Sequence, residues 1–452
     1  MTRKELEIMA PAGNFGCLIA AIQGGADSVY FGIGHLNMRS HSANNFSRED
    51  LPEIMRICRE YGVKAYMTLN ITLYGEDLQP AYETLDAAKA AGVNAIIASD
   101  MACILYCRKI GLEVHISTQL SISNIEALRF YAQFADVVVL ARELNLDQVR
   151  AIHEAIVSEH ITGPSGELVR IEMFAHGAFC MAVSGKCYMS LSAYGASANR
   201  GACLQPCRRG YLLTDYETGF EVNVDNKYLM SPKDLCTIDF LDKFVEAGVK
   251  VFKIEGRARS ADYVKTTVEC YREAANAVAD GIYTPELGAS YKDRLATVFN
   301  RGFWDGYYLG AKMGEWSAVY GSQATRNKVY IGKVTNWFGR IGVAEIQVET
   351  RDLPKGCDML IIGKEGSICA KECAIIAQAH IHMTTEDAQK YQVKDGQRMS
   401  VQLASDRPVV LENVIARVKD KSKAFLAMHI DFDEANAACV NEGTKAFIVK
   451  RW

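Results

Sequence analysis

The chain has 452 residues, of which 49% are hydrophobic and 23% are charged, an ordinary composition for a globular protein. Its formal net charge of −4 excludes a globally basic nucleic-acid-binding protein, although a local basic patch is still compatible with it. No apolar run approaches the roughly 18 residues of a membrane span, and residues 1–7 lack the apolar core of a signal peptide. We therefore expect a cytoplasmic protein whose 14 cysteines are reduced thiols or metal ligands.

The N-terminal part alternates short β-like runs with amphipathic helical segments. Eight runs are predicted as strands, at 6–10, 28–32, 64–69, 95–98, 113–117, 136–140, 171–175 and 249–254. Between them, helices are predicted at 50–61, 78–91, 124–134 and 146–158, and another helix follows at 263–279. Repeated β–α units with apolar strands imply a parallel sheet covered by helices, and eight of them favour a (β/α)8 TIM-like barrel over 1–283.

The seventh and eighth predicted strands are unusually far apart, and a Cys-rich insertion at 177–230 lies between them. It leaves from the C-terminal end of strand 7, the face on which barrel enzymes carry their active sites. Residues 284–326 are expected to be a connecting segment in which Pro285, Gly302 and Gly310 break the helical pattern. A small all-β barrel is predicted over 327–452, with strands at 329–334, 342–348, 359–362, 399–403, 409–418 and 425–430.

Four cysteines of the insertion, Cys180, Cys187, Cys203 and Cys207, are spaced as C-x6-C-x15-C-x3-C in a glycine-rich loop. Structural zinc sites usually bring their ligands in tight C-x2-C pairs, so this spacing fits zinc poorly. Four soft sulfur ligands on an irregular loop suit a four-iron iron–sulfur cluster better. Zinc and buried thiols without a ligand are the alternatives. Cys236 is a further candidate for the fourth ligand, and the remaining cysteines are interpreted as core residues.

Polar residues follow several of the predicted strands, at the end where a barrel opens. They are Asn70, Asp100, Gln119, Arg142, Glu143, Glu172, His176, Lys253, Glu255 and Arg257. Polar side chains buried at the mouth of an apolar barrel must be paired or form a site, because leaving them unpaired costs free energy. Structural ion pairs, for example between Glu143 or Glu255 and Arg142 or Arg257, are the competing interpretation.

Several motifs together resemble one family. The stretch Glu172-x-Phe174-x-His176-Gly177-Ala178-Phe179-Cys180-x4-Gly185-x-Cys187-x-Met189-Ser190 is similar to the signature of the collagenase-like peptidase family U32. The opening Ala10-Pro11-Ala12-Gly13-Asn14, the run 25–32 and the run Lys253-Ile254-Glu255-Gly256-Arg257 resemble the same family. The segment that begins at Lys328 looks like its C-terminal β-domain. Phe179 departs mildly from the family pattern, which usually has an aliphatic residue there.

The resemblance implies one of several activities. Some members of the family are named peptidases, whereas others are oxygen-independent hydroxylases that carry a four-iron (4Fe-4S) cluster and act on tRNA, ribosomal RNA or ubiquinone. Chain length, the Cys203-x3-Cys207 spacing and the β-domain make this chain most similar to the tRNA branch. That branch forms 5-hydroxyuridine at the wobble position and requires prephenate. The partners expected from it are the tRNA anticodon loop, prephenate and a second copy or a related subunit.

The residues at the barrel mouth can be given roles in such a reaction. Glu172 and His176 could move the proton released when C–H becomes C–OH, with Lys253 and Glu255 as further catalytic candidates. His176 could instead donate a hydrogen bond to cluster sulfur. The substrate-binding candidates are Asn70, Gln119, Arg142, Glu143 and Arg257. Lys253, Arg257 and Arg259 suit the carboxylates of prephenate, since guanidinium groups pair well with carboxylates.

The insertion also carries features of an RNA-binding surface. Arg200, Arg208 and Arg209 flank the cysteines and could contact phosphates, although solvated loop charge is the simpler interpretation. Tyr188, Tyr194 and Tyr211 could stack on a base turned out of an RNA loop.

Two other classes of function compete with the hydroxylase. A peptidase would need an activated nucleophile or a catalytic zinc, but the chain has no His-Glu-x-x-His motif and no evident Gly-x-Ser-x-Gly elbow. A non-catalytic adaptor would use the β-domain to bind RNA or protein and the cysteine loop as a structural metal clip. Stoichiometric zinc would favour the adaptor, and acid-labile sulfide would favour the hydroxylase.

Overall fold

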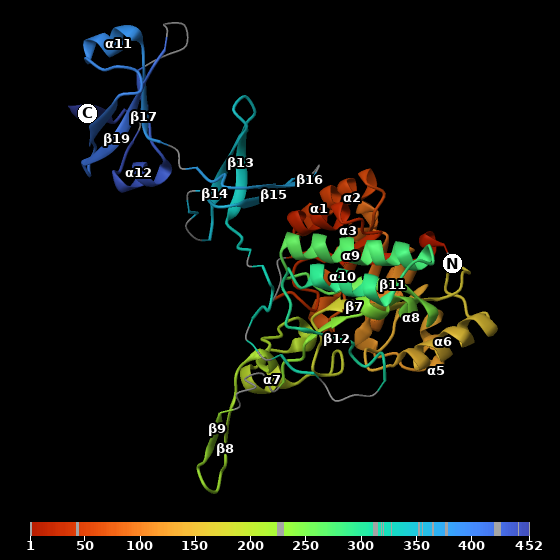
Figure 1. Ribbon diagram of the computed structural model, residues 1–452. Helices are drawn as coiled ribbons and strands as arrows, with labels where there is room; N and C mark the ends of the chain where they lie inside the picture. Colours follow the sequence, from red (N-terminus) through yellow and green to blue (C-terminus); the bar gives the residue numbers. More distant parts are fainter. Residues whose placement is uncertain are drawn as a thin grey trace. The chain divides into compact units, whose positions relative to one another are not determined.

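The structure is a computed structural model (Figure 1). It describes residues 2–41, 45–223, 230–310, 315–317, 319, 321–326, 328–350, 353–354, 356–363, 366–375, 378–419, 426–441 and 443–451. The chain divides into two compact units, residues 1–330 with 362–367 and residues 331–361 with 368–452. Part of the predicted insertion, 224–229, and Phe425 of the predicted strand 425–430 lie outside the described residues.

The first unit is built on a closed parallel barrel of eight strands, as predicted. These are β1 (Glu7–Pro11), β2 (Ser28–Gly32), β3 (Lys64–Leu69), β4 (Ala95–Ala98), β5 (Glu113–Ile116), β6 (Val137–Val139), β7 (Arg170–Gly177) and β11 (Val249–Ile254). Each strand pairs in parallel with the next, and pairing of β7 with β11 closes the barrel. The register between β7 and β11 shifts between Lys253 and Ile254, so that Lys253 pairs with Phe174 while Ile254 pairs with His176.

Helices cover the outside of the barrel (Figure 1). They are α1 (Phe15–Gln23), α2 (Leu51–Glu60), α3 (Leu78–Ala91), α4 (Met101–Ile110), α5 (Ile125–Ala132), α6 (Leu146–Ser158), α8 (Leu241–Glu246) and α9 (Ala261–Ala279). Asn14, Asn124 and Ser260 cap the N-termini of α1, α5 and α9 through side-chain oxygens that accept backbone N–H groups. The connections also contain single 3₁₀ turns at Arg3–Glu5, Arg48–Asp50, Gly75–Asp77, Thr118–Leu120, Ala198–Arg200, Pro206–Arg208 and Ile238–Phe240.

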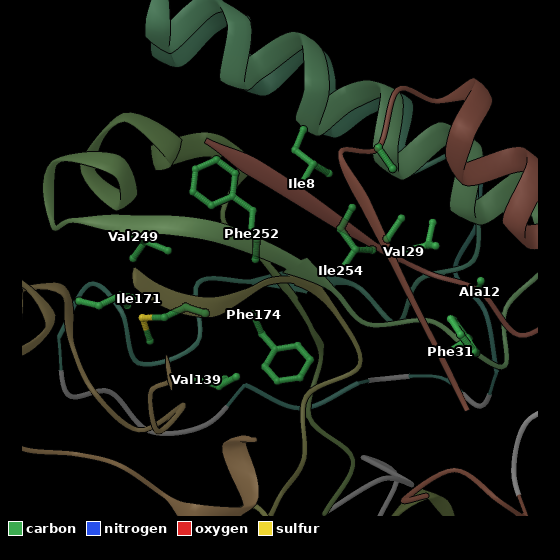
Figure 2. Packing of buried hydrophobic residues seen from close by; sticks show 14 of the residues in the cluster. Ile8, Ala12, Val29, Phe31, Val139, Ile171, Phe174, Val249, Phe252 and Ile254 are labelled. Carbon is green, nitrogen blue, oxygen red and sulfur yellow. The ribbon is translucent and has the colours of Figure 1, made fainter. Parts of the chain in front are cut away.

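Alternation along the strands separates two sets of buried residues. Ile8, Phe31 and Phe252 belong to the large cluster formed with the helices (Figure 2). Met9 and Tyr30, their neighbours in the chain, belong to a separate cluster of buried residues that also includes Tyr66, Ala95, Ile97, Val137 and Val251. Since successive side chains of a strand point to opposite faces, this second cluster lines the interior of the barrel.

The predicted insertion leaves from the C-terminal end of β7. It contains α7 (Met189–Tyr194) and a two-stranded hairpin of β8 (Leu212–Thr214) and β9 (Glu221–Asn223), which extends away from the barrel (Figure 1). The chain returns through β10 (Asp234–Cys236), which pairs antiparallel with β7, and β12 (Phe303–Trp304) later pairs with β10. At the exit, Gly177 has φ of 104°, and a Cβ there would lie 2.4 Å from the Glu255 carbonyl oxygen. Glycine is therefore required at this position.

The expectation that Pro285 breaks the helical pattern was wrong. Helix α10 (Pro285–Leu295) begins at this residue, and the Thr284 side chain caps it by accepting the Leu287 N–H. Proline is favoured in the first turn, where its missing N–H would have no partner within the helix.

The C-terminal region is β-rich, as predicted. It contains β13 (Gly332–Phe338), β14 (Val343–Val348), β15 (Met359–Gly363), β16 (Gly366–Ala370), β17 (His380–Met383), β18 (Arg398–Ala404), β19 (Val409–Val418), β20 (Ala427–His429) and β21 (Lys445–Arg451), with the short helices α11 (Thr385–Lys390) and α12 (Phe432–Ala437). Its largest sheet is a half-barrel with the strand order β20-β17-β19-β18-β21, packed over buried residues such as Met383, Met399 and Val414. None of the helices in the described ranges has both the length and the apolar composition needed to cross a membrane.

Candidate active site at the barrel mouth

A buried ion pair joins the two strands that close the barrel. Lys253 Nζ on β11 lies 2.7 Å from Glu172 Oε1 on β7, and the exposed fractions of the two side chains are 7% and 0%. Burial raises the pKa of Glu172, but Lys253 and His115 outweigh burial and lower it below its usual value. Glu172 is therefore a carboxylate at neutral pH. Lys253 also lies over the rings of Tyr30 and Phe174, at 4.8 and 5.5 Å from their centroids.

His115 extends this pair, and the sequence analysis did not single it out. Its Nδ1 lies 3.7 Å from Glu172 Oε2, and its Nε2 lies 3.3 Å from Glu113 Oε1. Burial lowers the pKa of His115, but Glu113 and Glu172 outweigh it, so that the pKa is raised. The signal in the sequence was an alternating strand, 113–117, in which His115 shares a polar face with Glu113 and Ser117 while Val114 and Ile116 point to the other face.

Glu255 lies just beyond the end of β11 and is held by a guanidinium. Arg39, from the loop after β2, donates to Glu255 Oε1 through Nη2 at 2.6 Å and through Nε at 3.1 Å. The Tyr30 hydroxyl donates to Glu255 Oε2 at 3.2 Å. Burial opposes ionisation of Glu255, but the charges of Arg39, Arg142 and Arg257 overcome it and lower the pKa to about 2.

The other two guanidinium groups are also buried. Arg142 stacks over the ring of Phe174, 3.8 Å from its centroid, and its Nε has no hydrogen-bond partner in the described structure. Arg257 donates through Nη1 to Thr68 Oγ1 at 3.1 Å, and burial lowers its pKa to about 10, so it is still charged at neutral pH. Arg39 is therefore the guanidinium that contacts Glu255, while Arg142 and Arg257 add positive charge at the same end of the barrel.

Of the other polar residues predicted for the site, some lie at the barrel mouth and some do not. Asn70 donates through Nδ2 to Ser117 Oγ at 3.2 Å and to Gln119 Oε1 at 3.3 Å, which forms a polar cluster after β3 and β5. Asp100 caps α4 and accepts from the Leu73 N–H, so its role is structural. Glu143 is exposed, and Arg259 lies over the ring of Phe299.

His176 is not brought together with Glu172, although both lie on β7. Its ring contacts Tyr263 and Tyr271 of α9 and Phe303 of β12, with centroids 5.6 to 6.0 Å apart. Burial lowers the pKa of His176 to about 3, and its Nδ1 has no hydrogen-bond partner among the described residues. The imidazole is therefore neutral at physiological pH.

Three cysteines of the insertion lie close enough to Cys207 to act on it electrostatically. Burial raises the pKa of Cys207, Arg208 lowers it, and Cys180, Cys203 and Cys187 raise it further. The His41 backbone N–H donates to the Gly201 carbonyl oxygen at 3.3 Å, which connects the cysteine loop with the loop after β2. Within the described ranges, no three Cys, His, Asp or Glu side chains stand in the geometry of a metal site. The four sulfur atoms would therefore have to draw together around an ion or a cluster.

Cys236 has different surroundings. It lies on β10, opposite His176 in the register with β7, and its exposed fraction is 3%. Burial raises the pKa of its thiol to about 12, and the charged groups that act on it are Asp239 and Lys292. These surroundings favour Cys207 over Cys236 as the fourth member of the group.

Two of the three arginines of the insertion have structural contacts. Arg208 donates to Ser231 Oγ and to the carbonyl oxygens of Pro232 and Phe179, each at 2.7 Å. Arg200 forms an ion pair with Asp77 at 2.6 Å. Tyr211 donates through its hydroxyl to the Pro206 carbonyl oxygen at 2.8 Å. Arg209 is exposed and lies over the ring of Tyr194.

Comparison with curated proteins shows three informative relatives. The chain is 55% identical over 401 residues to a protein named collagenase from Porphyromonas gingivalis, which covers 89% of this chain and 95% of that protein. It is 34% identical over 342 residues to tRNA hydroxylation protein P1 of Bacillus subtilis, covering 74% of this chain and 78% of the relative. It is 37% identical over 317 residues to 23S rRNA 5-hydroxycytidine C2501 synthase of Escherichia coli, covering 69% of this chain and 46% of the relative.

Two family models match the chain in succession. The model described as phosphate propanoyltransferase matches residues 327–441, which lie mostly in the C-terminal region. The model described as peptidase family U32 matches residues 13–318, the barrel together with its cysteine insertion. Because that match spans more than half of the chain and includes the barrel mouth, the protein belongs to peptidase family U32.

Proposed function

We propose that this protein is an RNA-modifying hydroxylase that forms 5-hydroxyuridine at the tRNA wobble position, with a 4Fe-4S cluster as cofactor and prephenate as co-substrate. The names of the relatives from B. subtilis and E. coli support an RNA substrate and a hydroxylation reaction. The proposed partner is the tRNA anticodon loop.

The observation that carries this proposal is the charge balance at the barrel mouth. Arg39 forms an ion pair with Glu255, whereas Arg257 donates to Thr68 and Arg142 stacks over Phe174. Among the described residues, neither of these last two buried guanidinium groups has an ion-pair partner. Prephenate has two carboxylates, so its charge matches these two groups. Guanidinium groups are well suited to bind carboxylates because they can donate two parallel hydrogen bonds.

The donor set of the insertion fits the proposed cofactor. Cys180, Cys187, Cys203 and Cys207 are free thiols, and none of them is fully buried. Four cysteine sulfurs are the usual ligands of a 4Fe-4S cluster. When bound, such a cluster would supply redox chemistry that amino-acid side chains lack.

The protein's own residues would handle protons and orientation. The Lys253 ammonium holds a proton 2.7 Å from Glu172, and His115 lies on the other side of that carboxylate. Because Glu172 and His115 are fully buried, this group would hold charge and protons beneath the mouth and would not touch the base itself. Asn70 and Gln119 offer amide groups that could bind the polar edge of a base. The neutral, enclosed imidazole of His176 is better suited to supporting the fold.

The proposal is tested by the nucleosides of tRNA from a strain that lacks the gene. Mass spectrometry should show loss of the nucleosides derived from 5-hydroxyuridine, and the wild-type gene should restore them while a Cys180→Ser gene should not. Anaerobically purified protein should also restore the modification in tRNA from the deletion strain, in a reaction that depends on prephenate. If the tRNA stayed unmodified in that purified reaction, the proposal would be contradicted. A redundant enzyme in the cell could not explain such a result.

Peptidase activity is the second candidate because the relative with 55% identity is named collagenase. Cys236 and His176 are opposite one another on β10 and β7, but their exposed fractions are only 3% and 1%. With a thiol pKa near 12 and an imidazole pKa near 3, both groups are neutral. A catalytic cysteine must form a thiolate that a peptide can reach, so this pair does not support the candidate. Cleavage of collagen or casein by purified protein, abolished by Cys236→Ser, would reverse this conclusion.

A further inference from the structure

The cysteine loop differs in charge from the rest of the chain. Residues 177–211 contain Lys186, Arg200, Arg208 and Arg209 and no aspartate or glutamate, although the whole chain has a net charge of −4. Local positive charge in an acidic protein marks a surface for an anionic partner. Because Arg208 and Arg200 are used in structural contacts, Lys186 and Arg209 are the exposed positive charges of this loop.

The same loop exposes apolar and aromatic side chains. They are Met181, Val183, Tyr188, Leu191, Tyr194 and Leu204, with exposed fractions from 40% to 71%. Single exposed hydrophobic residues are common on protein surfaces, but a group of them within one loop marks an interaction site. Tyr188 is the most exposed of the group, at 71%.

Two tyrosine rings of this region are covered by arginine. The guanidinium of Arg209 lies 4.7 Å from the ring centroid of Tyr194 and donates to its hydroxyl. The guanidinium of Arg200 lies 3.9 Å from the ring centroid of Tyr74, which comes from the loop after β3. Arg200 is fixed by Asp77 and by the Thr72 carbonyl oxygen, so the Tyr74 pair has a defined orientation. Each pair offers a flat, positively charged surface.

We propose that Tyr188 and the Tyr194–Arg209 pair form a stacking surface for unpaired bases of RNA, with Lys186 contacting the phosphates. This inference rests on the proposed function, in which RNA is the substrate, and assigns the residues that bind it outside the barrel mouth. Proteins that bind single-stranded nucleic acid combine positive charge with aromatic rings on which bases stack. The absence of carboxylates from 177–211 removes the repulsion that a phosphate backbone would otherwise meet.

The β8–β9 hairpin of the same insertion differs in charge from the cysteine loop. Its residues include Asp215, Glu217 and Glu221 and no basic residue within 212–223. These carboxylates would repel phosphates, so the RNA strand should leave the surface before it reaches the hairpin.

Binding of a fluorescent anticodon stem–loop RNA to the full chain, followed by anisotropy at fixed salt concentration, tests the proposal. Tyr194→Leu and Tyr188→Leu should each raise Kd about tenfold, the size expected for loss of one stacked base. Tyr194→Phe keeps the ring and should bind nearly as tightly as wild type, which separates stacking from the hydrogen bond to Arg209. Tyr61→Leu, at an exposed position that follows α2, is the matched control and should not change Kd.

The possible outcomes separate this inference from the proposed function. Wild-type protein that binds the stem–loop while both leucine variants bind equally well would overturn the stacking surface and leave the proposed function standing. Wild-type protein that fails to bind any RNA but binds anionic lipid vesicles or a peptide would overturn both. Circular dichroism of each variant, compared with wild type, establishes that a loss of binding is not a loss of folding.

Discussion

Lys253 Nζ and Glu172 Oε1 are 2.7 Å apart inside the barrel, on two strands whose pairing closes it. The pair of strands that closes the barrel therefore also carries this buried ion pair. Charges withdrawn from water are stable only while each has its partner, because an uncompensated buried charge is strongly unfavourable. The Lys253–Glu172 pair is thus expected to contribute to the stability of the barrel.

We predict that Lys253→Met lowers the free energy of unfolding by about 3–5 kcal/mol, because Glu172 would be left as a buried carboxylate without its cation. Urea denaturation followed by circular dichroism measures this change. Lys250→Met is the matched control on the same strand, since its side chain and that of its partner Glu5 are 20% and 47% exposed, and such a pair should contribute far less than the buried one.

The double variant Lys253→Met with Glu172→Leu should recover part of the lost stability. It removes both charges, so no buried charge is left uncompensated. If the single and double variants were equally unstable, the loss would come from packing and the charge argument would be refuted.

Stability should depend on pH through His176. Its pKa in the folded protein is about 3, below its ordinary value of 6.5, so the unfolded chain takes up a proton as the pH falls below 6.5 while the folded protein does not. The contribution of His176 is therefore fully present above pH 6.5 and is lost progressively toward pH 3, by up to about 1.4 kcal/mol for each pH unit.

His176→Phe should reduce this part of the pH dependence, since phenylalanine has a similar ring, suits the aromatic contacts with Tyr263 and Tyr271, and does not titrate. The measurement is the free energy of unfolding of both proteins at several pH values between 4 and 7. An unchanged slope in the variant would show that other groups cause the dependence.

Cluster ligation can be assigned by substituting the cysteines one at a time. Cys180→Ser, Cys187→Ser and Cys207→Ser should each lose most of the iron and acid-labile sulfide of anaerobically purified protein. Cys236→Ser is the matched control and should retain both, because Cys236 is buried at a different place, beside Asp239 and Lys292. Iron retained in the Cys207 variant and lost in the Cys236 variant would reverse the assignment.

Gly32→Ala should weaken binding of prephenate. A Cβ at this position would lie 2.4 Å from Arg257 Nη1 and 2.7 Å from the Asn37 side chain, so the Arg257 guanidinium would have to move away from Thr68. Isothermal titration calorimetry should show a rise in Kd of about tenfold, which corresponds to about 1.4 kcal/mol. Gly75→Ala, where nothing lies within 4 Å, should bind prephenate like the wild type. Equal affinities of the two variants would remove Arg257 from the proposed site.

The barrel could be predicted from the sequence because its signals are local. The strands at 28–32, 64–69, 95–98 and 249–254 have the predicted bounds, since each is a short run rich in apolar residues that ends at polar residues or glycine. The position of the cysteine insertion could be predicted for the same reason, from an interval between two strands that was too long. Helix α10 was missed because proline was interpreted as a break where it serves as a helix start.

Contacts between residues far apart in the chain determined which side chains meet at the candidate site. Glu172 and His176 are four residues apart on one strand, which suggested a shared role. However, the register between β7 and β11 shifts between these two residues, and their side chains meet different surroundings. Glu172 meets Lys253 inside the barrel, whereas His176 packs among aromatic rings from α9 and β12. Arg39 reaches Glu255 from a loop more than 200 residues earlier in the chain, and no local pattern identifies such a partner. The sequence by itself determined which strands form and where the cysteines gather, whereas the tertiary structure decided which charges face one another, because such contacts depend on how distant strands align.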